Sequence, residues 1–285
     1  MILKEALRWA TGEIHASQVS DTPLLDASLL LCHIVNLTRV ELYTKENNSL
    51  TASQEQNYRV AVARRTAHHP IAYLTGKKEF YGREFTVSPA VLIPRRDTET
   101  AVETTLGLLS KESSCPRVLD LCCGSGCIGI TIALEHPSSR VTLSDISEEA
   151  LSVTRENAAL YNIDPEIIHS DLFSNIQERD FTCIVTNPPY VTPAWYAECS
   201  PEVHEEPRSA IVDESVSGLS IIENIILESP SYLHKDGYLV IECDYRQVEA
   251  VQTLMSAAEF ADITVTPDMG GRDRVVSGRM TCTRI

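Results

Sequence analysis

Apolar strands alternate with helical stretches from about residue 97 to the carboxyl terminus. The strands read "RVLDLC", "RVTLSD", "FTCIVTN" and "YLVIEC", and helical stretches such as 147–161 and 219–233 separate them. Strands that are apolar on both faces are typical of a parallel sheet that helices cover on both sides. The alternation therefore predicts an α/β fold with a mostly parallel sheet. The final stretch, "DITVTPDMGGRDRVVSGRM", predicts two antiparallel strands around a glycine-rich turn at the sheet edge.

The first 75 residues have a different pattern and predict a small helical bundle. One helix follows a cap at Asp21 or Thr22 with Pro23 in its first turn, and another follows a cap at Thr51 or Ser53. Aromatic and β-branched residues around Gly82 predict a β-hairpin within 77–94. The predicted domains are 1–75 (helical), 76–96 (hairpin linker) and 97–285 (α/β).

The charge of the chain is divided unevenly between these parts. The 285 residues carry a net charge of −16, with 43% hydrophobic and 22% charged residues, which is typical of a globular protein. Counting Lys and Arg against Asp and Glu gives 12 − 9 = +3 for 1–96 and 12 − 31 = −19 for 97–285. An acidic main domain repels phosphate backbones, so we do not expect nucleic acid as the substrate.

Apolar runs and cysteines bear on the compartment and on metal binding. No apolar run reaches the roughly 20 residues that a membrane-spanning helix needs, and the amino terminus lacks a signal-peptide core. The nine cysteines lie mostly in apolar surroundings, as expected for reduced buried thiols. Cys122, Cys123 and Cys127 have no partner motif at zinc-like spacing. We therefore expect a cytoplasmic protein that has no metal and does not bind membranes.

Candidate ligand-binding residues follow the strands "RVLDLC" and "RVTLSD" and a further expected strand that ends before "SDLF". In "DLCCGSGC", Gly124 and Gly126 allow the backbone to approach a ligand, and the next helix directs amide N–H groups toward it. Asp145 closes the second strand and is placed to bind ribose hydroxyls, although a helix cap is an alternative role. Asp171 and Leu172 in "HSDLF" are candidates for contacting an adenine ring, again with a cap as the alternative.

The motif Asn187-Pro188-Pro189-Tyr190 follows the "FTCIVT" strand and is unusually stiff. Pro188 restrains Asn187 to an extended conformation. The side-chain carbonyl of Asn187 and the backbone carbonyl of Pro188 can form two fixed acceptors beside the Tyr190 ring. Two acceptors beside an aromatic ring suit a planar –NH2 group. Since the region around this site is acidic rather than basic, a phosphate-bearing dinucleotide is disfavoured, and S-adenosylmethionine, an adenosine cofactor with a positive centre, is the expected cofactor.

Taken together, these motifs resemble a known family. The segments "DLCCGSG", "LSD", "SDLF" and "NPPY" resemble class I S-adenosylmethionine-dependent methyltransferases that act on amino groups. The segments "IAYLTGKKEFYGREFTVSPAVLIPRRDTE", "HEEPRSAI", "IECDYRQ" and "GGRDRVVSGR" resemble the bacterial peptide chain release factor N5-glutamine methyltransferases. The resemblance extends from about residue 68 to 280, and it implies a mostly parallel seven-stranded sheet.

The resemblance also implies a substrate and roles for residues. The substrate would be the glutamine of the Gly-Gly-Gln motif in class I release factors, recognised by the helical domain. Cofactor contacts would come from Cys122, Cys123, Gly124, Ser125, Gly126, Asp145, Asp171, Leu172, Asn187 and Arg95, with 95–99 helping to close the site. Asn187, Pro188, Pro189 and Tyr190 would form the glutamine pocket.

The chain departs from the family pattern at three places, and two other functions stay open. Cys122 stands at the first glycine of the family's loop, Arg96-Asp97 replaces Pro-Glu, and Cys243-Asp244 stands where a glycine is usual. A DNA adenine-N6 methyltransferase would use the same grip on an amine. The phosphates of its DNA substrate could contact a set of basic residues, for which a solvated helix face is the alternative role. These residues are Arg59, Arg64, Arg65, His68 and His69. The other alternative is a non-catalytic binding protein.

Overall fold

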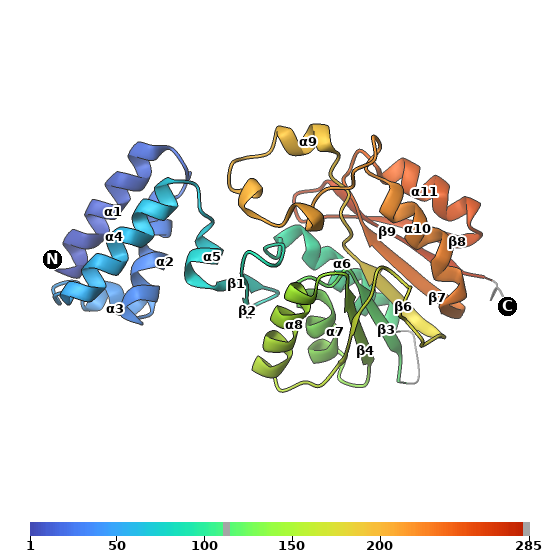
Figure 1. Cartoon of the computed structure of the whole chain (residues 1–285). Helices are drawn as coiled ribbons and strands as arrows, with labels where there is room; N and C mark the ends of the chain where they lie inside the picture. The colour runs from blue at the N-terminus through green and yellow to red at the C-terminus, as the bar shows by residue number, and fades with distance from the viewer. Residues whose placement is uncertain (111–114, 282–285) are drawn as a thin grey trace. The chain divides into compact units, whose positions relative to one another are not determined.

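The computed structural model describes residues 1–110 and 115–281, and the chain divides into two compact units (Figure 1). The first unit comprises Met1–Lys77 and Ser200–Glu205, and the second comprises Lys78–Cys199 and Glu206–Ile285. The predicted hairpin therefore groups with the second unit, apart from its first residue. Residues 111–114 and 282–285, part of the predicted 97–285 domain, lie outside the described residues.

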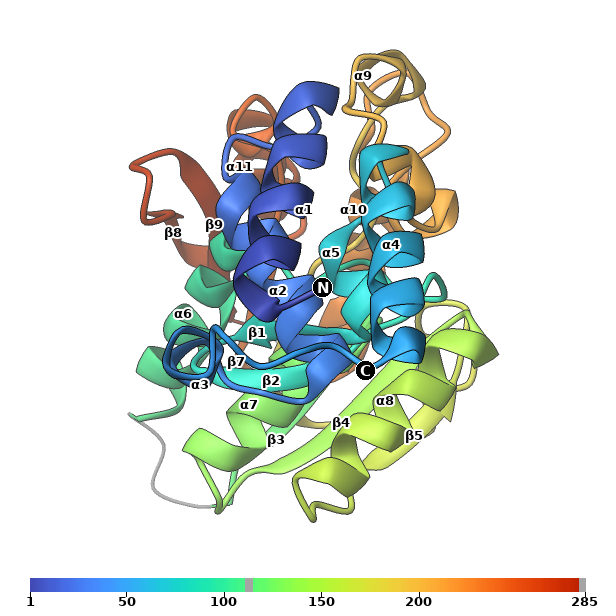
Figure 2. The same ribbon diagram turned by 90° about the vertical axis from the view of Figure 1, so that its left-hand side faces the viewer.

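The first unit is a bundle of helices. Its helices are α1 (Leu3–Ser17), α2 (Pro23–Val35), α3 (Arg39–Thr44), α4 (Ala52–Thr66) and α5 (Ile71–Thr75). Figure 2 shows α1, α2 and α4 packed side by side, around a core that includes Leu30, Leu31 and Tyr58. Thr22 precedes α2 with Pro23 at its first position, and Thr51 caps α4 through the amide of Gln54 at 3.2 Å. Both predicted helices are thus confirmed.

Arg65 does not lie on the solvated face of α4 that the sequence suggested. Its side chain is 5% exposed, and it pairs with Asp26 and with Glu202 at 2.7 Å each. Arg65 Nη2 also donates to the backbone carbonyl of Val19 at 3.1 Å. Because all three partners are acceptors within the first unit, Arg65 is a structural residue that anchors 200–205.

The second unit contains a seven-stranded sheet in the order β5-β4-β3-β6-β7-β9-β8. Its strands are β3 (Arg117–Leu121), β4 (Arg140–Asp145), β5 (Glu166–His169), β6 (Phe181–Thr186), β7 (Leu233–Glu242), β8 (Phe260–Pro267) and β9 (Asp273–Met280). The five strands from β3 to β7 are all parallel to their neighbours among one another, in the pairs β4–β5, β3–β4, β3–β6 and β6–β7. β9 runs antiparallel to β7, and β8 runs antiparallel to β9. The predicted mostly parallel sheet and the carboxyl-terminal hairpin at its edge are confirmed.

Helices cover both faces of the sheet (Figure 1). α6 (Glu99–Leu109), α7 (Cys127–Glu135) and α8 (Glu148–Leu160) lie on one face, and α10 (Ser220–Glu228) and α11 (Val248–Ala257) lie on the other. A short helix, α9 (Pro193–Ala197), follows β6. Successive residues of one strand enter different cores, as Ile184 and Val185 do. This alternation is what makes each strand apolar on both faces.

Two local predictions differ from the structure. The helix expected over 219–233 ends at Glu228, because Pro230 lies in a 3-10 turn (Ser229–Ser231) and β7 begins at Leu233. The hairpin expected within 77–94 is shorter, with β1 (Lys77–Phe80) and β2 (Arg83–Thr86) around Tyr81 and Gly82. Both residues of its turn have positive φ, as tight hairpin turns require.

No helix in the described ranges is long and apolar enough to cross a membrane.

Candidate active site

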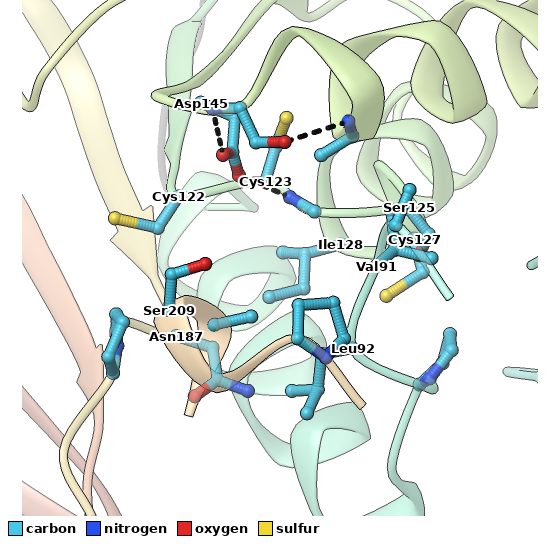
Figure 3. Close-up of a pocket in the computed structure, with 18 of the residues that line it drawn as sticks. Val91, Leu92, Cys122, Cys123, Ser125, Cys127, Ile128, Asp145, Asn187 and Ser209 are labelled. Carbon is cyan, nitrogen blue, oxygen red and sulfur yellow. Dashed lines mark hydrogen bonds between the residues drawn. The ribbon is translucent and has the colours of Figure 1, made fainter. Parts of the chain in front are cut away.

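A pocket lies at the carboxyl ends of the central parallel strands, where ligands bind in open α/β sheets. β3 and β6 are neighbours, and the register pairs Leu121 with Thr186, so the loops that follow them start side by side. The pocket encloses roughly 820 Å³ of empty space, a figure that includes open solvent at its mouth. Its lining residues are Ala90, Val91, Leu92, Pro94, Arg95, Thr98, Cys122, Cys123, Gly124, Ser125, Cys127, Ile128, Asp145, Ile146, Ser147, Ala150, Asn187, Pro189, Pro207, Ser209 and Ala210 (Figure 3).

The loop after β3 is built from left-handed backbone conformations. Cys122, Gly124 and Gly126 have φ of 61°, 55° and 78°. A Cβ on Gly126 would lie 2.9 Å from side-chain atoms of Ile130 and Thr154, so this position requires glycine for space as well as for φ. Cys122, in contrast, is a non-glycine residue in a region that L-residues disfavour.

Hydrogen bonds from two side chains of α8 hold this loop. Thr154 of α8 donates to the Gly124 carbonyl at 2.8 Å. The buried side chain of Asn157, also in α8, donates to the Ser125 carbonyl at 2.9 Å. The same Asn157 side chain accepts from the Thr86 amide at 2.7 Å and donates to the Thr86 carbonyl at 3.0 Å. One amide therefore connects the glycine loop, α8 and the end of the hairpin.

Asp145 ends β4 and points into the pocket with both carboxylate oxygens oriented. Its Oδ2 accepts from the Gly124 amide at 2.8 Å, and its Oδ1 accepts from the Ser147 amide at 2.9 Å. Each oxygen keeps acceptor capacity toward a ligand. Burial raises the pKa of Asp145, while the backbone hydrogen bonds oppose that rise. The side-chain cap of α8 is Ser147, whose hydroxyl accepts from Ala150.

The Asn-Pro-Pro-Tyr segment directly follows β6. Asn187 lines the pocket, and its Nδ2 donates to the Thr98 hydroxyl at 3.3 Å, whereas no described residue donates to its Oδ1. Pro188 is buried, and Pro189 lines the pocket. The side-chain carbonyl of Asn187 is thus the group left to accept a hydrogen bond at this wall.

Glu206 joins two distant segments that each contribute residues to the pocket lining. Its side chain is 1% exposed, pairs with Arg95, and accepts from the Ile93 amide at 2.9 Å. Pro207, Ser209 and Ala210, which follow Glu206, line the same pocket as residues of the 90–98 segment. A buried carboxylate with a cationic and an amide partner is well satisfied, so it can hold these walls together.

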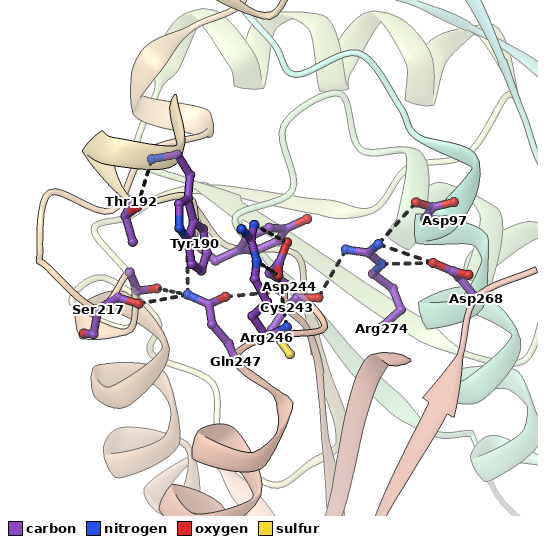
Figure 4. Close-up of polar contacts among 12 residues, drawn as sticks. Asp97, Tyr190, Thr192, Ser217, Cys243, Asp244, Arg246, Gln247, Asp268 and Arg274 are labelled. Carbon is purple, nitrogen blue, oxygen red and sulfur yellow. Dashed lines mark hydrogen bonds and ion pairs between the residues drawn. The ribbon is translucent and has the colours of Figure 1, made fainter. Parts of the chain in front are cut away.

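A second network lies behind the Asn-Pro-Pro-Tyr segment (Figure 4). The Tyr190 hydroxyl donates to Glu242 Oε1 at 3.3 Å. Gln247 Nε2 contacts the backbone carbonyl of Tyr190 at 3.0 Å and those of Ser217 and Gly218 at 3.1 Å. Both the ring and the backbone of Tyr190 are therefore fixed by residues that lie outside the pocket lining.

The structure brings together most of the site residues expected from the sequence. Cys122, Cys123, Gly124, Ser125, Asp145, Arg95, Asn187 and Pro189 line one pocket. Gly126, Pro188, Tyr190, Asp171 and Leu172 are not among the lining residues, so the ligand contacts expected of them stay predictions. Asp171 is exposed and Leu172 packs against the main core, so their contact with adenine stays a prediction.

Sequence reasoning missed several lining residues. Ile146 is 59% exposed beside Asp145, and an apolar residue directly after the β4 carboxylate was a signal that could have found it. Val91, Leu92 and Ser209 lie in segments that resembled the family, but no pattern within those segments assigns them to the pocket.

Two family models match parts of the chain. "Methyltransferase small domain" matches residues 97–198, and "PrmC N-terminal domain" matches residues 5–76. A methyltransferase structure from Pyrococcus furiosus superposes with a TM-score of 0.52 over 80% of this chain and all of the other, at 14% identity. At that identity the superposition supports the fold alone.

Curated relatives match over nearly the full length. A release factor glutamine methyltransferase of Koribacter versatilis is 39% identical and covers 98% of this chain and 99% of its own. One from Neisseria gonorrhoeae is 36% identical and covers 92% of this chain and 95% of its own. Identity at this level, along the whole of both chains, shows common descent. The chain belongs to the release factor glutamine methyltransferase family.

Proposed function

We propose that this enzyme transfers a methyl group from S-adenosylmethionine to the side-chain nitrogen (N5) of the glutamine in the Gly-Gly-Gln motif of class I peptide chain release factors. The orientation of Asn187 carries the proposal. Since its Nδ2 donates to Thr98, its Oδ1 remains an acceptor at the pocket wall, as an incoming –NH2 group requires.

The residues of the pocket fit S-adenosylmethionine. Asp145 offers acceptor capacity for a ribose diol, and the exposed side chain of Ile146 offers an apolar surface for an adenine ring. Even a Cβ placed on Gly124 would have no atom within 4 Å, so a ligand can approach the backbone closely there. The acidic character of the 97–285 region also suits a sulfonium cation.

The bound cofactor supplies an electrophilic methyl group. The work of the chain is to hold the amide nitrogen, a poor nucleophile because its lone pair is delocalised into the carbonyl. Asn187 Oδ1 and the Pro188 carbonyl would accept from the two N–H groups of the glutamine and orient its nitrogen. The same acceptors would stabilise positive charge that develops on that nitrogen. S-adenosylhomocysteine would be the leaving group, and the methylated nitrogen would lose one proton to water. The proposed chemistry uses no metal ion.

We assign recognition of the release factor to the helical residues 1–75. Support comes from the match of residues 5–76 to the amino-terminal domain model of this family and from the +3 charge of residues 1–96. Residues 97–285 would bind the cofactor and perform the transfer. Since release factors work on ribosomes, the enzyme would act in the cytoplasm.

Mass spectrometry of a purified release factor tests the proposal. After incubation with the enzyme and S-adenosylmethionine, we expect one added methyl group on the peptide that contains Gly-Gly-Gln. Replacing that glutamine by glutamate in the release factor should abolish the addition. A parallel reaction with adenine-containing duplex DNA should give no methylated adenine. Methylation of the DNA instead of the release factor would refute the proposal.

A further inference from the structure

We propose that Glu242 is a positioning residue that sets the side-chain orientation of Asn187 through the Thr98 hydroxyl and holds the Tyr190 ring through its own hydroxyl. The inference rests on the proposed function, because it assigns Asn187 Oδ1 the task of accepting from the substrate amide. Glu242 itself is not among the residues that line the pocket, so it acts through its neighbours.

Glu242 occupies a position from which it can reach both neighbours. It is the last residue of β7, which lies beside β6, and it is only 2% exposed. Its Oε1 accepts from the Tyr190 hydroxyl at 3.3 Å, and the Thr98 hydroxyl lies close enough to stabilise its charged form. Its Oε2 is buried and is the acceptor that this network leaves unfilled among the described residues. A buried carboxylate oxygen without a donor is costly, so a neighbouring hydroxyl group is favoured to point its hydrogen toward the carboxylate.

The direction of each hydrogen bond follows from this arrangement. An ionised carboxylate only accepts, so the Thr98 hydroxyl would direct its single hydrogen toward Glu242. Thr98 Oγ1 must then act as an acceptor toward Asn187, which requires Asn187 to present Nδ2, as the structure has it at 3.3 Å. Without the carboxylate, Thr98 could donate to Asn187 instead. The amide would then turn and place a donor where the substrate needs an acceptor.

The charge state of Glu242 controls this relay. Burial is the main cause that raises the pKa of Glu242 to about 7, and the Thr98 hydroxyl, Arg274 and Tyr190 oppose the rise. The titratable and charged groups that face it are Asp97 beside Thr98, Tyr190 after β6, Arg274 on β9, Cys127 on α7 and Cys243 on its own segment. Because the ionised form orients the relay, methyl transfer should decline as the pH falls below about 7.

The first test compares Glu242→Gln with Glu178→Gln. Glu178 pairs with Arg117 at the opposite, amino-terminal end of β3 and serves as a control for the same chemical change. For Glu242→Gln we expect kcat on the release factor to fall roughly 10- to 100-fold, as for a misplaced reacting group. The dissociation constant of S-adenosylmethionine, measured by calorimetry, should change less than about twofold. The acidic limb of the wild-type pH profile should disappear, whereas Glu178→Gln should retain both rate and profile.

The second test needs neither cofactor nor substrate. In protein labelled with ¹⁵N-asparagine, the Asn187 side-chain amide signals, assigned with an Asn187→Gln variant, should shift with pH near the pKa of Glu242. The shift should be absent in Glu242→Gln and in Thr98→Val. Should Glu242→Gln not fold, Thr98→Val carries the test, since it removes only the hydroxyl that connects the two residues.

The outcomes separate this inference from the proposed function. A wild-type enzyme that does not methylate release factor contradicts the proposed function, while the NMR titration still tests the relay. A wild-type enzyme that methylates release factor, with Glu242→Gln within about twofold of its kcat and an Asn187 signal insensitive to pH, overturns the positioning role.

Discussion

Two neighbouring loops of the second unit achieve a defined geometry by opposite means. The loop after β3 uses three residues with positive φ, and the segment after β6 uses two consecutive prolines. The two loops start from paired strand residues, Leu121 and Thr186, and both contribute to one pocket. The difference lies in where each loop obtains its stability.

The β3 loop depends on its surroundings because its backbone is permissive. Asp145, Thr154 and Asn157 each supply a hydrogen bond to residues 124–125, and without them this backbone could adopt many conformations. The β6 segment has little backbone freedom, so its surroundings mainly determine side-chain direction, as Thr98 does for Asn187. The β3 loop thus shapes backbone space for a ligand, whereas the β6 segment orients specific polar atoms.

The largest expected effect comes from removing the side-chain carbonyl of Asn187. In Asn187→Ala, kcat for methylation of the release factor should fall about 100- to 1,000-fold, as when one fixed polar group is lost from a transition-state site. The dissociation constant of S-adenosylmethionine should rise much less. Single-turnover kinetics and calorimetry measure the two quantities. A variant with near-wild-type turnover would falsify the paired-acceptor mechanism.

The next largest effect should come from filling space in the glycine loop. In Gly126→Ala the new Cβ would meet Ile130 and Thr154 at 2.9 Å in a left-handed backbone. We expect a loss of about 2 to 3 kcal/mol in the free energy of unfolding and weaker cofactor binding. Gly124→Ala is the matched control, because its φ is also positive but no atom lies within 4 Å, and we expect a loss of about 1 kcal/mol. Equal losses in urea denaturation would contradict the steric reason.

A pH-dependent effect should come from Asp120, just before the glycine loop. It is fully buried, and burial raises its pKa from 3.8 to about 8, while a 2.8 Å hydrogen bond from the Gly129 amide opposes the rise. The native state therefore keeps a proton that the unfolded chain releases above about pH 4, so stability should decrease as the pH rises from 4 to 8.

Urea denaturation across this pH range tests the Asp120 prediction. In Asp120→Asn the free energy of unfolding should decrease less as the pH rises. Part of the remaining decrease should come from Glu242, because its pKa is also raised and acts with the same sign. An unchanged slope in Asp120→Asn would show that Asp120 is not the group that holds the proton.

The smallest effect should come from relaxing the strained residue of the β3 loop. Cys122→Gly replaces a side chain at φ 61° by the residue that tolerates this conformation. We expect a gain of up to about 1 kcal/mol, reduced by the greater freedom of glycine in the unfolded chain. Thermal denaturation measures the gain, and a clear loss would mean that packing of the Cys122 side chain outweighs its backbone strain.

Local patterns were enough to predict the elements of the fold and much of the pocket. The apolar runs of β3, β4 and β6 specify buried parallel strands, and the residues directly after them lie at the carboxyl edge of the sheet. Asp145 and Asn187 were found in this way. The end of α10 was missed, since the effect of Pro230 depended on where β7 begins.

Contacts between distant residues could not be read from local patterns. Glu206 reaches Ile93 across 113 positions, Asn157 reaches Thr86 across 71, and Asn187 reaches Thr98 across 89. The left-handed conformation of Cys122 was likewise not evident from residue type, because cysteine usually avoids it.

The sequence by itself determined the succession of strands and helices along the chain, the stiff segment after β6 and the family motifs. These follow from residue type and short-range periodicity. Only the tertiary structure decided which way Asn187 turns, how the glycine loop is held and which carboxylates are buried. Those properties depend on hydrogen-bond partners and on exclusion of water, and both arise only when distant segments pack together.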